Sequence, residues 1–201
     1  KRPGEYYPVY ESEKGTFILN SRDLCLIEYI PQIIKSGVSS LKIEGRMKSS
    51  FYVATVVKAY RQAIDAYYQD EDNSKTNPKF LEEVSKASRR EYTTGFFLNK
   101  PDSKTQIYNT SSYIREYDFI GVVIKYDSDT KIATIEQRNR MYKGDVIEVL
   151  NPEGGFYIQK IEWMKNVDGD YIDVAPHPQM IVSMPMLKEV QKYTIIRRKS
   201  L

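Results

Sequence analysis

The sequence changes its character near Asp118, and this change constrains the fold more than any other feature. Six short runs rich in β-branched and aromatic residues follow: FIGVVIKY, KIATIEQ, DVIEVL, FYIQKIEW, YIDVA and MIVSMPM. Turn residues such as Asp127–Asp129 and Asp168–Asp170 separate them. Short strands at regular spacing with Gly/Asp turns are typical of a small antiparallel barrel or sandwich. We therefore predict an all-β domain over residues 118–201, a small β-barrel.

The first seventy or so residues show instead an alternation of strand and helix patterns. The first predicted elements are a strand at Thr16–Leu19 and a short helix over Asp23–Ile27, with Asn20-Ser21 supplying its N-cap. A second helical piece at Pro31–Ser36, a strand at Val38–Glu44 and a long helix from Ser49 follow. Such alternation with short connections favours a parallel sheet covered by helices.

Two βα units cannot bury both faces of a sheet, and a complete (β/α)₈ barrel needs about 250 residues. We therefore interpret residues 1–75 as the last βα units of an incomplete TIM-like barrel. Residues 76–117 are expected to contain a helix over Pro78–Arg89, with Asn77 as its N-cap, and a connecting segment. The expected fold class is α/β plus all-β: barrel units followed by a small antiparallel β-barrel.

Composition narrows the class of protein. The chain is 41% apolar and 28% charged, which fits a folded protein. No apolar run approaches about 18 residues, so we expect no membrane partner. The single cysteine, Cys25, excludes an internal disulfide framework and favours a reducing, cytoplasmic compartment. The net charge of +3 is compatible with an anionic partner without requiring one.

The stretch LKIEGRMKSS holds the candidate site. Lys42, Glu44 and Arg46 stand at every second position, so on a strand they share one face. If Leu41 and Ile43 face the helices, the three charges point into the barrel mouth, where barrel enzymes build active sites. Buried charges need partners, which leaves two interpretations open: a mutually compensating ion-pair network, or a ligand-binding edge.

Arg46, Lys48 and Ser49 then lead into the N-terminus of the long helix. Free N–H groups, the positive end of the helix dipole and two cations favour a phosphate or carboxylate there. Ordinary capping by Ser49 or Ser50 is the alternative interpretation. The stretch contains no glycine spacing typical of nucleotide binding.

Two other residues bear on chemistry. Cys25 is expected near the start of a helix, where the dipole favours the thiolate, although a lone cysteine on an apolar helix is more often packed in a core. The only histidine, His177, stands between two prolines. Since the sequence has no HExxH, GxSxG or plausible Cys/His pairing, triad and zinc protease chemistry lack support.

The block NSRDLCLIEYIPQIIKSGVSSLKIEGRMKSSFYVATVVKAYRQAID resembles the late-barrel motif of the U-32 peptidase (collagenase-like) family. The resemblance continues through Tyr92–Phe96 and Phe119–Val123 and extends over essentially the whole chain. Within the family, the chain resembles the bacterial prephenate-dependent tRNA uridine hydroxylation proteins. The resemblance implies a TIM-like barrel followed by a small β-barrel domain, in agreement with the division above.

The resemblance also implies a function for the intact protein, namely a tRNA-modifying enzyme needed for hydroxylation of the wobble uridine. Its implied partners are tRNA, prephenate or a similar carboxylate as co-substrate, and a paralogous family member. Two alternatives stay open: a collagenase-like protease, which is a hydrolase, and a non-catalytic RNA-binding or scaffold fragment. Whether this fragment is itself an enzyme also stays open.

Site residues follow from the resemblance in the same way. The implied groups are Lys42, Glu44 and Arg46 for catalysis, and Arg46, Lys48 and Ser49 for binding a carboxylate or phosphate. Cys25 corresponds to one of four cysteines that hold an iron–sulfur cluster in several family members. The other three are absent from this chain, so the fragment by itself is expected to retain no cluster.

Overall fold

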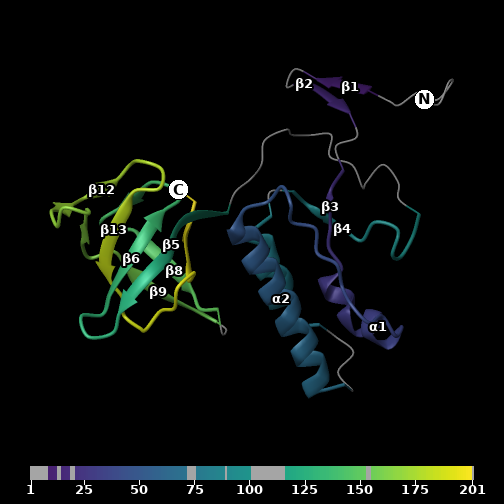
Figure 1. Cartoon of the computed structure of the whole chain (residues 1–201). Coiled ribbons are helices and arrows are strands. Elements are labelled where there is room, and N and C mark those ends of the chain that lie inside the picture. The colour runs from purple at the N-terminus through teal and green to yellow at the C-terminus, as the bar shows by residue number, and fades with distance from the viewer. Residues whose placement is uncertain are drawn as a thin grey trace. The chain divides into compact units, whose positions relative to one another are not determined.

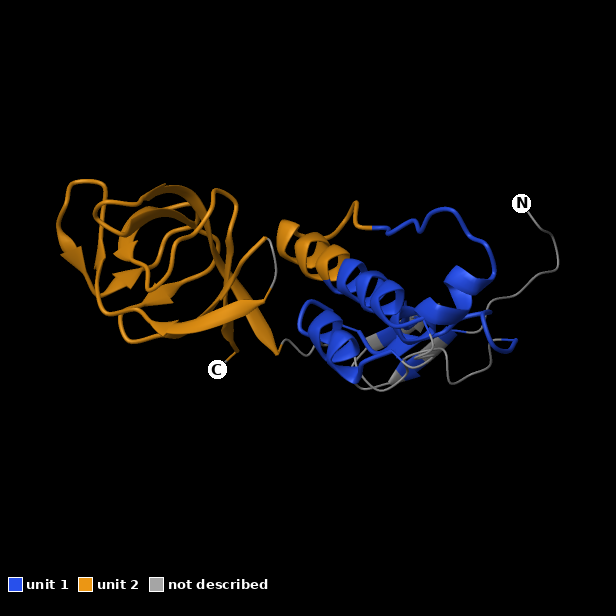
Figure 2. Cartoon of the chain, turned by 90° about the horizontal axis from the view of Figure 1, so that it is seen from below, with its two compact units in different colours: residues 1–44, 59–114 blue, residues 45–58, 115–201 orange. Residues whose placement is uncertain are grey.

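The computed structural model describes residues 9–12, 15–18, 21–71, 76–88, 90–100, 116–152 and 155–200 (Figure 1). The chain divides into two compact units (Figure 2). Unit 1 comprises residues 1–44 and 59–114, and unit 2 comprises residues 45–58 and 115–201. In the part of the chain that is described, no helix is both long and apolar enough to cross a membrane.

Unit 1 combines short strands with helices. Its elements are β1 (Val9–Ser12), β2 (Gly15–Ile18), β3 (Asp23–Leu24), a 3₁₀ turn at Ile27–Tyr29, α1 (Ile30–Lys35), the second half of α2 (Ser50–Gln69), α3 (Pro78–Ser85) and β4 (Tyr92–Thr93). Strands β1 and β2 form an antiparallel hairpin, whereas β3 and β4 pair in parallel.

Helices α1, α2 and α3 confirm three of the four helical patterns predicted from the sequence. Along α2, buried residues recur at every fourth position, at Phe51, Thr55, Ala59, Ala63 and Tyr67. This spacing places them on one face of the helix, which is the face that packs. The N-cap prediction for α3 is also confirmed, because the Asn77 side-chain oxygen accepts a hydrogen bond from the Lys79 backbone N–H at 3.0 Å.

The predicted strand at Val38–Glu44 is wrong. The segment has no regular secondary structure, and Val38 is 51% exposed and Leu41 37% exposed. A strand is stabilised by ladder hydrogen bonds to a neighbour, and none of the described strands pairs with this segment. The alternation of apolar and charged residues therefore does not separate two faces of a sheet here.

The prediction of a helix over Asp23–Ile27 is also wrong, since β3 lies there. The Asp23 N–H donates to Glu91 O at 3.0 Å, and the Cys25 N–H donates to Thr93 O at 3.0 Å. The strand predicted at Thr16–Leu19 exists as β2, but it belongs to a hairpin, with Leu19 and Asn20 outside the described residues. The described part of unit 1 thus shows one parallel strand pair, and the TIM-like barrel stays a prediction.

Unit 2 contains the predicted antiparallel β structure. Its strands are β5 (Tyr117–Asp127), β6 (Ile132–Gln137), β7 (Met141–Tyr142), β8 (Val146–Leu150), β9 (Phe156–Lys160), β10 (Met164–Lys165), β11 (Tyr171–Ile172), β12 (Val174–Ala175), β13 (Ile181–Pro185) and β14 (Ile195–Lys199). Eight of them form one sheet in the order β11-β10-β13-β6-β5-β14-β8-β9, and β7 pairs with β12. The described strand pairings do not join β11 to β9, so hydrogen bonds between these edges do not close a barrel.

The inward side chains of this sheet form one apolar core. Alternation along β6 is typical of the arrangement, because Ala133, Ile135 and Gln137 are buried while the residues between them are partly exposed. The largest fully buried apolar side chains of the core are Ile120, Ile135, Met141, Ile147, Ile161, Met164, Met184 and Ile196. The six β-rich runs of the sequence supply most of these residues.

Strand β14, with the sequence IIRRK, contains three cations in a row and is not among the predicted strands. The ladder with β5 shifts register between Ile196 and Arg197, and Arg197 is fully buried. Its guanidinium donates to Glu148 Oε2 from Nε at 2.7 Å and from Nη2 at 2.6 Å. The Arg197 charge also lies 5.0 Å from the centre of the Tyr117 ring and 5.6 Å from that of Phe156. A carboxylate and aromatic faces thus compensate a buried cation.

Candidate functional site

The LKIEGRMKSS stretch forms an exposed loop and turn before α2. Lys42, Glu44 and Arg46 are all exposed, and they lie in a segment without strand structure. They therefore do not line the interior of a barrel in this structure, contrary to the expectation from their spacing. The prediction that they are catalytic rests on the family motif alone.

The turn that follows is closely fitted to the start of α2. The Lys48 N–H donates to Gly45 O at 3.0 Å and closes the turn. A Cβ atom at Gly45 would lie 2.8 Å from Val53 Cγ2, closer than real Cβ contacts come, so glycine lets the loop approach the helix. The ammonium group of Lys48 lies 4.9 Å from the centre of the Tyr52 ring.

Ser49 acts as a helix cap in this structure. Its Oγ accepts a hydrogen bond from the Tyr52 N–H at 3.3 Å, and its carbonyl accepts from the Val53 N–H at 3.2 Å. The capping interpretation of Ser49 is thus supported. Arg46 and Lys48 remain two exposed cations beside a helix N-terminus, an arrangement chemically suited to a carboxylate or phosphate.

Cys25 lies in unit 1 between β3 and the 3₁₀ turn, with 8% of its surface exposed. Its Sγ is 3.7 Å from the hydroxyl of Tyr60, which also accepts the Leu26 N–H at 3.0 Å. Burial raises the pKa of the Cys25 thiol, and hydrogen bonds from Ile27 and Tyr60 offset this effect only in part. Cys25 is not on a helix, so no helix dipole favours its thiolate, and its burial agrees with the alternative expectation of a cysteine packed in a core.

A cluster site is not complete within this chain. An iron–sulfur cluster usually takes four thiolates, and the sequence contains one cysteine. Among the described residues, no group of three or more His, Cys, Asp or Glu side chains is placed to hold a metal ion. Cys25 alone would supply one ligand, and a metal would have to displace its thiol proton, as at every cysteine ligand.

Unit 2 contains a polar cavity, open to solvent, that the sequence patterns did not predict. Its volume is about 350 Å³, and its lining residues are Gln137, Arg138, Asn139, Arg140, Pro176 and Pro178. The cavity lies where the turn after β6 meets the loop between β12 and β13. The signal in the sequence is the run QRNR at the end of β6, which places two cations and two amides within four residues.

Two family models match the chain, and together they extend over most of it. The model of Peptidase family U32 matches residues 3–107, and that of the Peptidase family U32 C-terminal domain matches residues 115–197. The chain therefore belongs to peptidase family U32.

Relatives in this family have two kinds of name. The chain is 40% identical over 190 residues to tRNA hydroxylation protein P1 of Bacillus subtilis, covering 94% of this chain and 45% of that protein. It is 32% identical over 205 residues to tRNA hydroxylation protein P of Escherichia coli, covering 98% of this chain and 43% of that protein. A collagenase of Porphyromonas gingivalis is 29% identical over 179 residues, with 89% of this chain and 49% of that protein covered.

The chain thus spans slightly less than half the length of these relatives. Among solved structures, it is 37% identical to the C-terminal domain of the Geobacillus thermoleovorans "putative U32 peptidase". That match covers 40% of this chain and 99% of the other, with a TM-score of 0.39.

Proposed function

We propose that this chain is part of a tRNA hydroxylation protein that acts on the wobble uridine. The observation that supports this most strongly is the 40% identity to tRNA hydroxylation protein P1, maintained over 94% of the chain. The identity to the collagenase is lower, at 29% over 89% of the chain. Because tRNA is the substrate, we place the protein in the cytoplasm.

Several finer features belong to the same proposal. We infer that residues 1–75 complete a TIM-like barrel with other parts of the parent protein, that residues 76–117 connect it to the next domain, and that residues 118–201 form a separate domain. The parallel pairing of Asp23↔Tyr92 and Leu24↔Thr93 agrees with the parallel sheet of such a barrel, although its second strand comes from residues 76–117.

The site residues have the following roles in this proposal. Arg46 and Lys48 bind the carboxylate of prephenate or a phosphate of tRNA, since both are exposed cations beside the start of α2. Lys42 and Glu44 orient that group or move protons. Cys25 contributes one ligand to an iron–sulfur cluster completed by cysteines outside this chain, and the cluster would supply redox chemistry. A paralogous family member is a further proposed partner.

The function is tested by deleting the gene for the intact protein and measuring tRNA nucleosides by mass spectrometry. We expect hydroxylated uridine to be lost and to return when the wild-type gene is restored. A strain lacking this protein and its paralogues that still contains undiminished hydroxyuridine would contradict the proposal. Digestion of collagen by the purified intact protein, with hydroxyuridine unchanged in the deletion strain, would support the protease alternative instead.

The role of Arg46 is tested with Arg46→Ala in the same complementation assay. We expect hydroxyuridine to fall while the melting temperature stays within about 1 °C of wild type, since the side chain is exposed. Arg61→Ala is the matched control, because Arg61 is an exposed arginine on α2 whose ion pair with Asp65 is a surface contact. Equal hydroxyuridine levels in the two variants would rule out a special role for Arg46.

A further inference from the structure

One end of unit 2 combines exposed lysines with an exposed tyrosine. We propose that this end binds a single-stranded stretch of RNA, with a base stacked on the ring of Tyr193 and phosphates on Lys125 and Lys192. The inference deepens the proposed function and rests on it, since tRNA is the RNA that such a protein would meet.

Backbone hydrogen bonds bring two segments together at this end. The loop between β13 and β14 is tied to the β5–β6 hairpin at both of its ends. The Met186 N–H donates to Lys131 O at 2.9 Å, and the Tyr193 N–H donates to Val123 O at 2.8 Å. The adjoining segments present four exposed lysines, which we call the lysine end: Lys125, Lys131, Lys188 and Lys192.

The charge of the lysine end favours an anionic ligand. None of its four lysines forms an ion pair with a described residue. The same segments contain three carboxylates, at Asp127, Asp129 and Glu189. The carboxylate of Asp127 accepts the N–H groups of Asp129 and Thr130, at 2.9 Å and 3.3 Å, within its own turn. The lysine charges are thus only partly compensated, and phosphates of an RNA strand would complete the compensation.

Tyr193 holds its ring in solvent on an unfavourable backbone. Its φ of 73° lies in the left-handed region, which favours glycine and asparagine over a bulky side chain. The turn is fixed because the Val123 N–H donates to Thr194 O at 2.9 Å and the Thr194 N–H donates to Gln191 O at 3.1 Å. The side chain is 67% exposed, so burial of the ring does little to offset the strain. The ring is therefore rigidly presented and available to a ligand.

An exposed ring among lysines suits the bases of a single strand. The ammonium group of Lys192 lies 5.0 Å from the centre of the Tyr193 ring. Proteins that bind single-stranded RNA combine a cationic surface for the phosphates with aromatic rings on which bases stack. In a duplex the bases are already stacked and paired, so a single strand is the form that can place a base on this ring.

The experiment is a fluorescence anisotropy titration of the full chain with a labelled single-stranded RNA of about ten nucleotides. We expect Tyr193→Asn to weaken binding about five- to tenfold, through the loss of one stacked base. The midpoint of unfolding in urea should not fall, because asparagine tolerates a left-handed backbone better than tyrosine does. Tyr193→Phe keeps the ring and should bind RNA like wild type.

Tyr171→Asn is the matched control. Tyr171 is 69% exposed, and Lys165 Nζ lies 4.6 Å from the centre of its ring, so the ring resembles that of Tyr193 in both respects. Its hairpin, however, contains one lysine against four carboxylates, at Glu162, Asp168, Asp170 and Asp173. Phosphates should avoid this hairpin, so Tyr171→Asn should change the affinity for RNA by less than about twofold.

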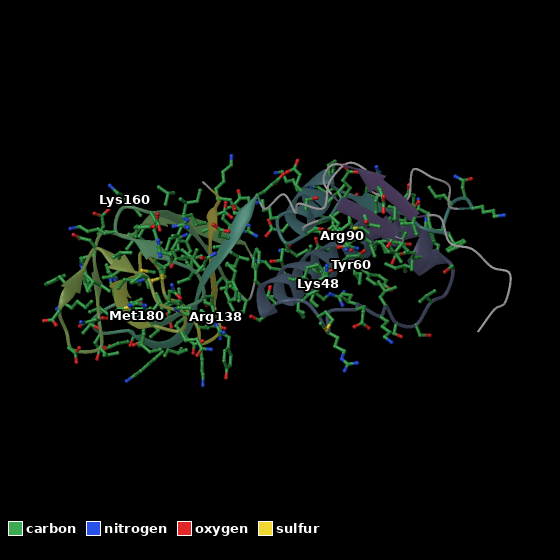
Figure 3. All side chains as sticks on the ribbon, turned by 90° about the horizontal axis from the view of Figure 1, so that it is seen from above. Lys48, Tyr60, Arg90, Arg138, Lys160 and Met180 are labelled. Atoms are coloured by element: carbon green, nitrogen blue, oxygen red, sulfur yellow. The ribbon has the colours of Figure 1, made fainter. Side chains whose placement is uncertain are left out.

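The phosphate contacts are tested through the salt dependence. Lys125→Ala and Lys192→Ala should each weaken binding and lower the slope of log affinity against log salt by about 0.7, the value for one phosphate of a single strand. Lys199→Ala is the control of equal charge, because Lys199 is exposed and pairs with the first residue of β5, whereas Lys125 is near the last. Arg138 follows the far end of β6 and lies on the same side of unit 2 as Met180 (Figure 3), away from the lysine end.

The contact to the base is tested with RNA that contains abasic residues and keeps every phosphate. Wild-type chain should bind it more weakly than the intact strand, and Tyr193→Asn should weaken that binding no further. A duplex of the same length should also bind more weakly than the single strand.

Three results would overturn the inference: equal effects of Tyr193→Asn and Tyr171→Asn, equal binding of abasic and intact RNA, or competition by an acidic peptide as effective as that by RNA. The last would indicate a surface for proteins. A loss of stability in Tyr193→Asn with RNA binding unchanged would likewise show that the ring serves the fold alone. Hydroxyuridine levels in the deletion strain report on the proposed function separately, so the failure of one proposal can be told from the failure of the other.

Discussion

The pair of Arg197 and Glu148 allows the energetics of unit 2 to be tested most directly. Replacing Glu148 with alanine removes both hydrogen bonds to the Arg197 guanidinium and also the acceptor of the Tyr117 hydroxyl, which lies 3.3 Å from Glu148 Oε1. Arg197 is fully buried, so its charge cannot reach water in the folded state. Breaking a buried pair in this way costs about 3–5 kcal/mol.

Unfolding in urea, followed by tryptophan fluorescence, measures this cost. The only tryptophan of the chain, Trp163, lies in unit 2, so the signal reports on this unit. With a slope of about 2 kcal/mol per molar urea, the midpoint of Glu148→Ala should fall by about 2 M. The control is Asp173→Ala, because Lys143 and Asp173 form an exposed pair at 3.4 Å. That variant should lose less than about 0.5 kcal/mol.

The double variant separates the pair from its surroundings. Arg197→Met together with Glu148→Leu leaves no buried charge. The stability lost by this double variant should therefore be about 2–4 kcal/mol smaller than the sum of the losses of Arg197→Met alone and Glu148→Leu alone. If Glu148→Ala costs no more than Asp173→Ala, or if the two single losses simply add, then the buried ion pair does not stabilise the sheet in the way described above.

Three further predictions concern local features. Gly45→Ala should lower the free energy of unfolding by about 1–3 kcal/mol, because the Cβ of the new alanine would meet Val53 Cγ2. In urea titrations, adding Val53→Ala should recover part of this loss. If Gly45→Ala causes no loss, the loop does not approach the helix so closely. Asn77→Ala should cost about 1 kcal/mol through loss of the cap of α3, whereas Asn77→Gly should cost less, as measured by thermal denaturation; equal costs would argue against capping. Burial raises the pKa of Tyr157 to about 12, so the folded state keeps the phenol proton at a pH where the unfolded state has lost it, near pH 10. The free energy of unfolding should therefore fall between pH 10 and 12. Tyr157→Phe should flatten the dependence of stability on pH in this range.

Local patterns in the sequence were sufficient for several elements. The β-rich runs after Asp118 predicted most strands of unit 2, and the spacing along Ser50–Gln69 predicted α2. Asn77 before Pro78 predicted a helix start, which its side chain confirms. These features depend on residues within one or two helical turns or along one strand, so the local sequence is sufficient to predict where such elements form.

The candidate site was predictable only in part. Ser49 was identified at the start of α2, and capping was one of its two interpretations, but Lys42 and Glu44 were placed on a strand that does not form. Alternation predicts two faces only when a neighbouring strand supplies ladder hydrogen bonds. Cys25 also differs from its prediction, because it follows β3 rather than lying on a helix, and its side chain is buried beside Tyr60.

By itself, then, the sequence determined the antiparallel β class of unit 2 and the positions of α1, α2 and α3, because periodicity and capping act between residues close along the chain. Only the tertiary structure decided that Asp23–Leu24 pairs with Tyr92–Thr93, that a cationic strand is buried against Glu148, and that the QRNR turn meets Pro176 and Pro178 around a cavity. Each of these depends on residues far apart in the chain, and their meeting follows from packing of the whole unit rather than from any local pattern.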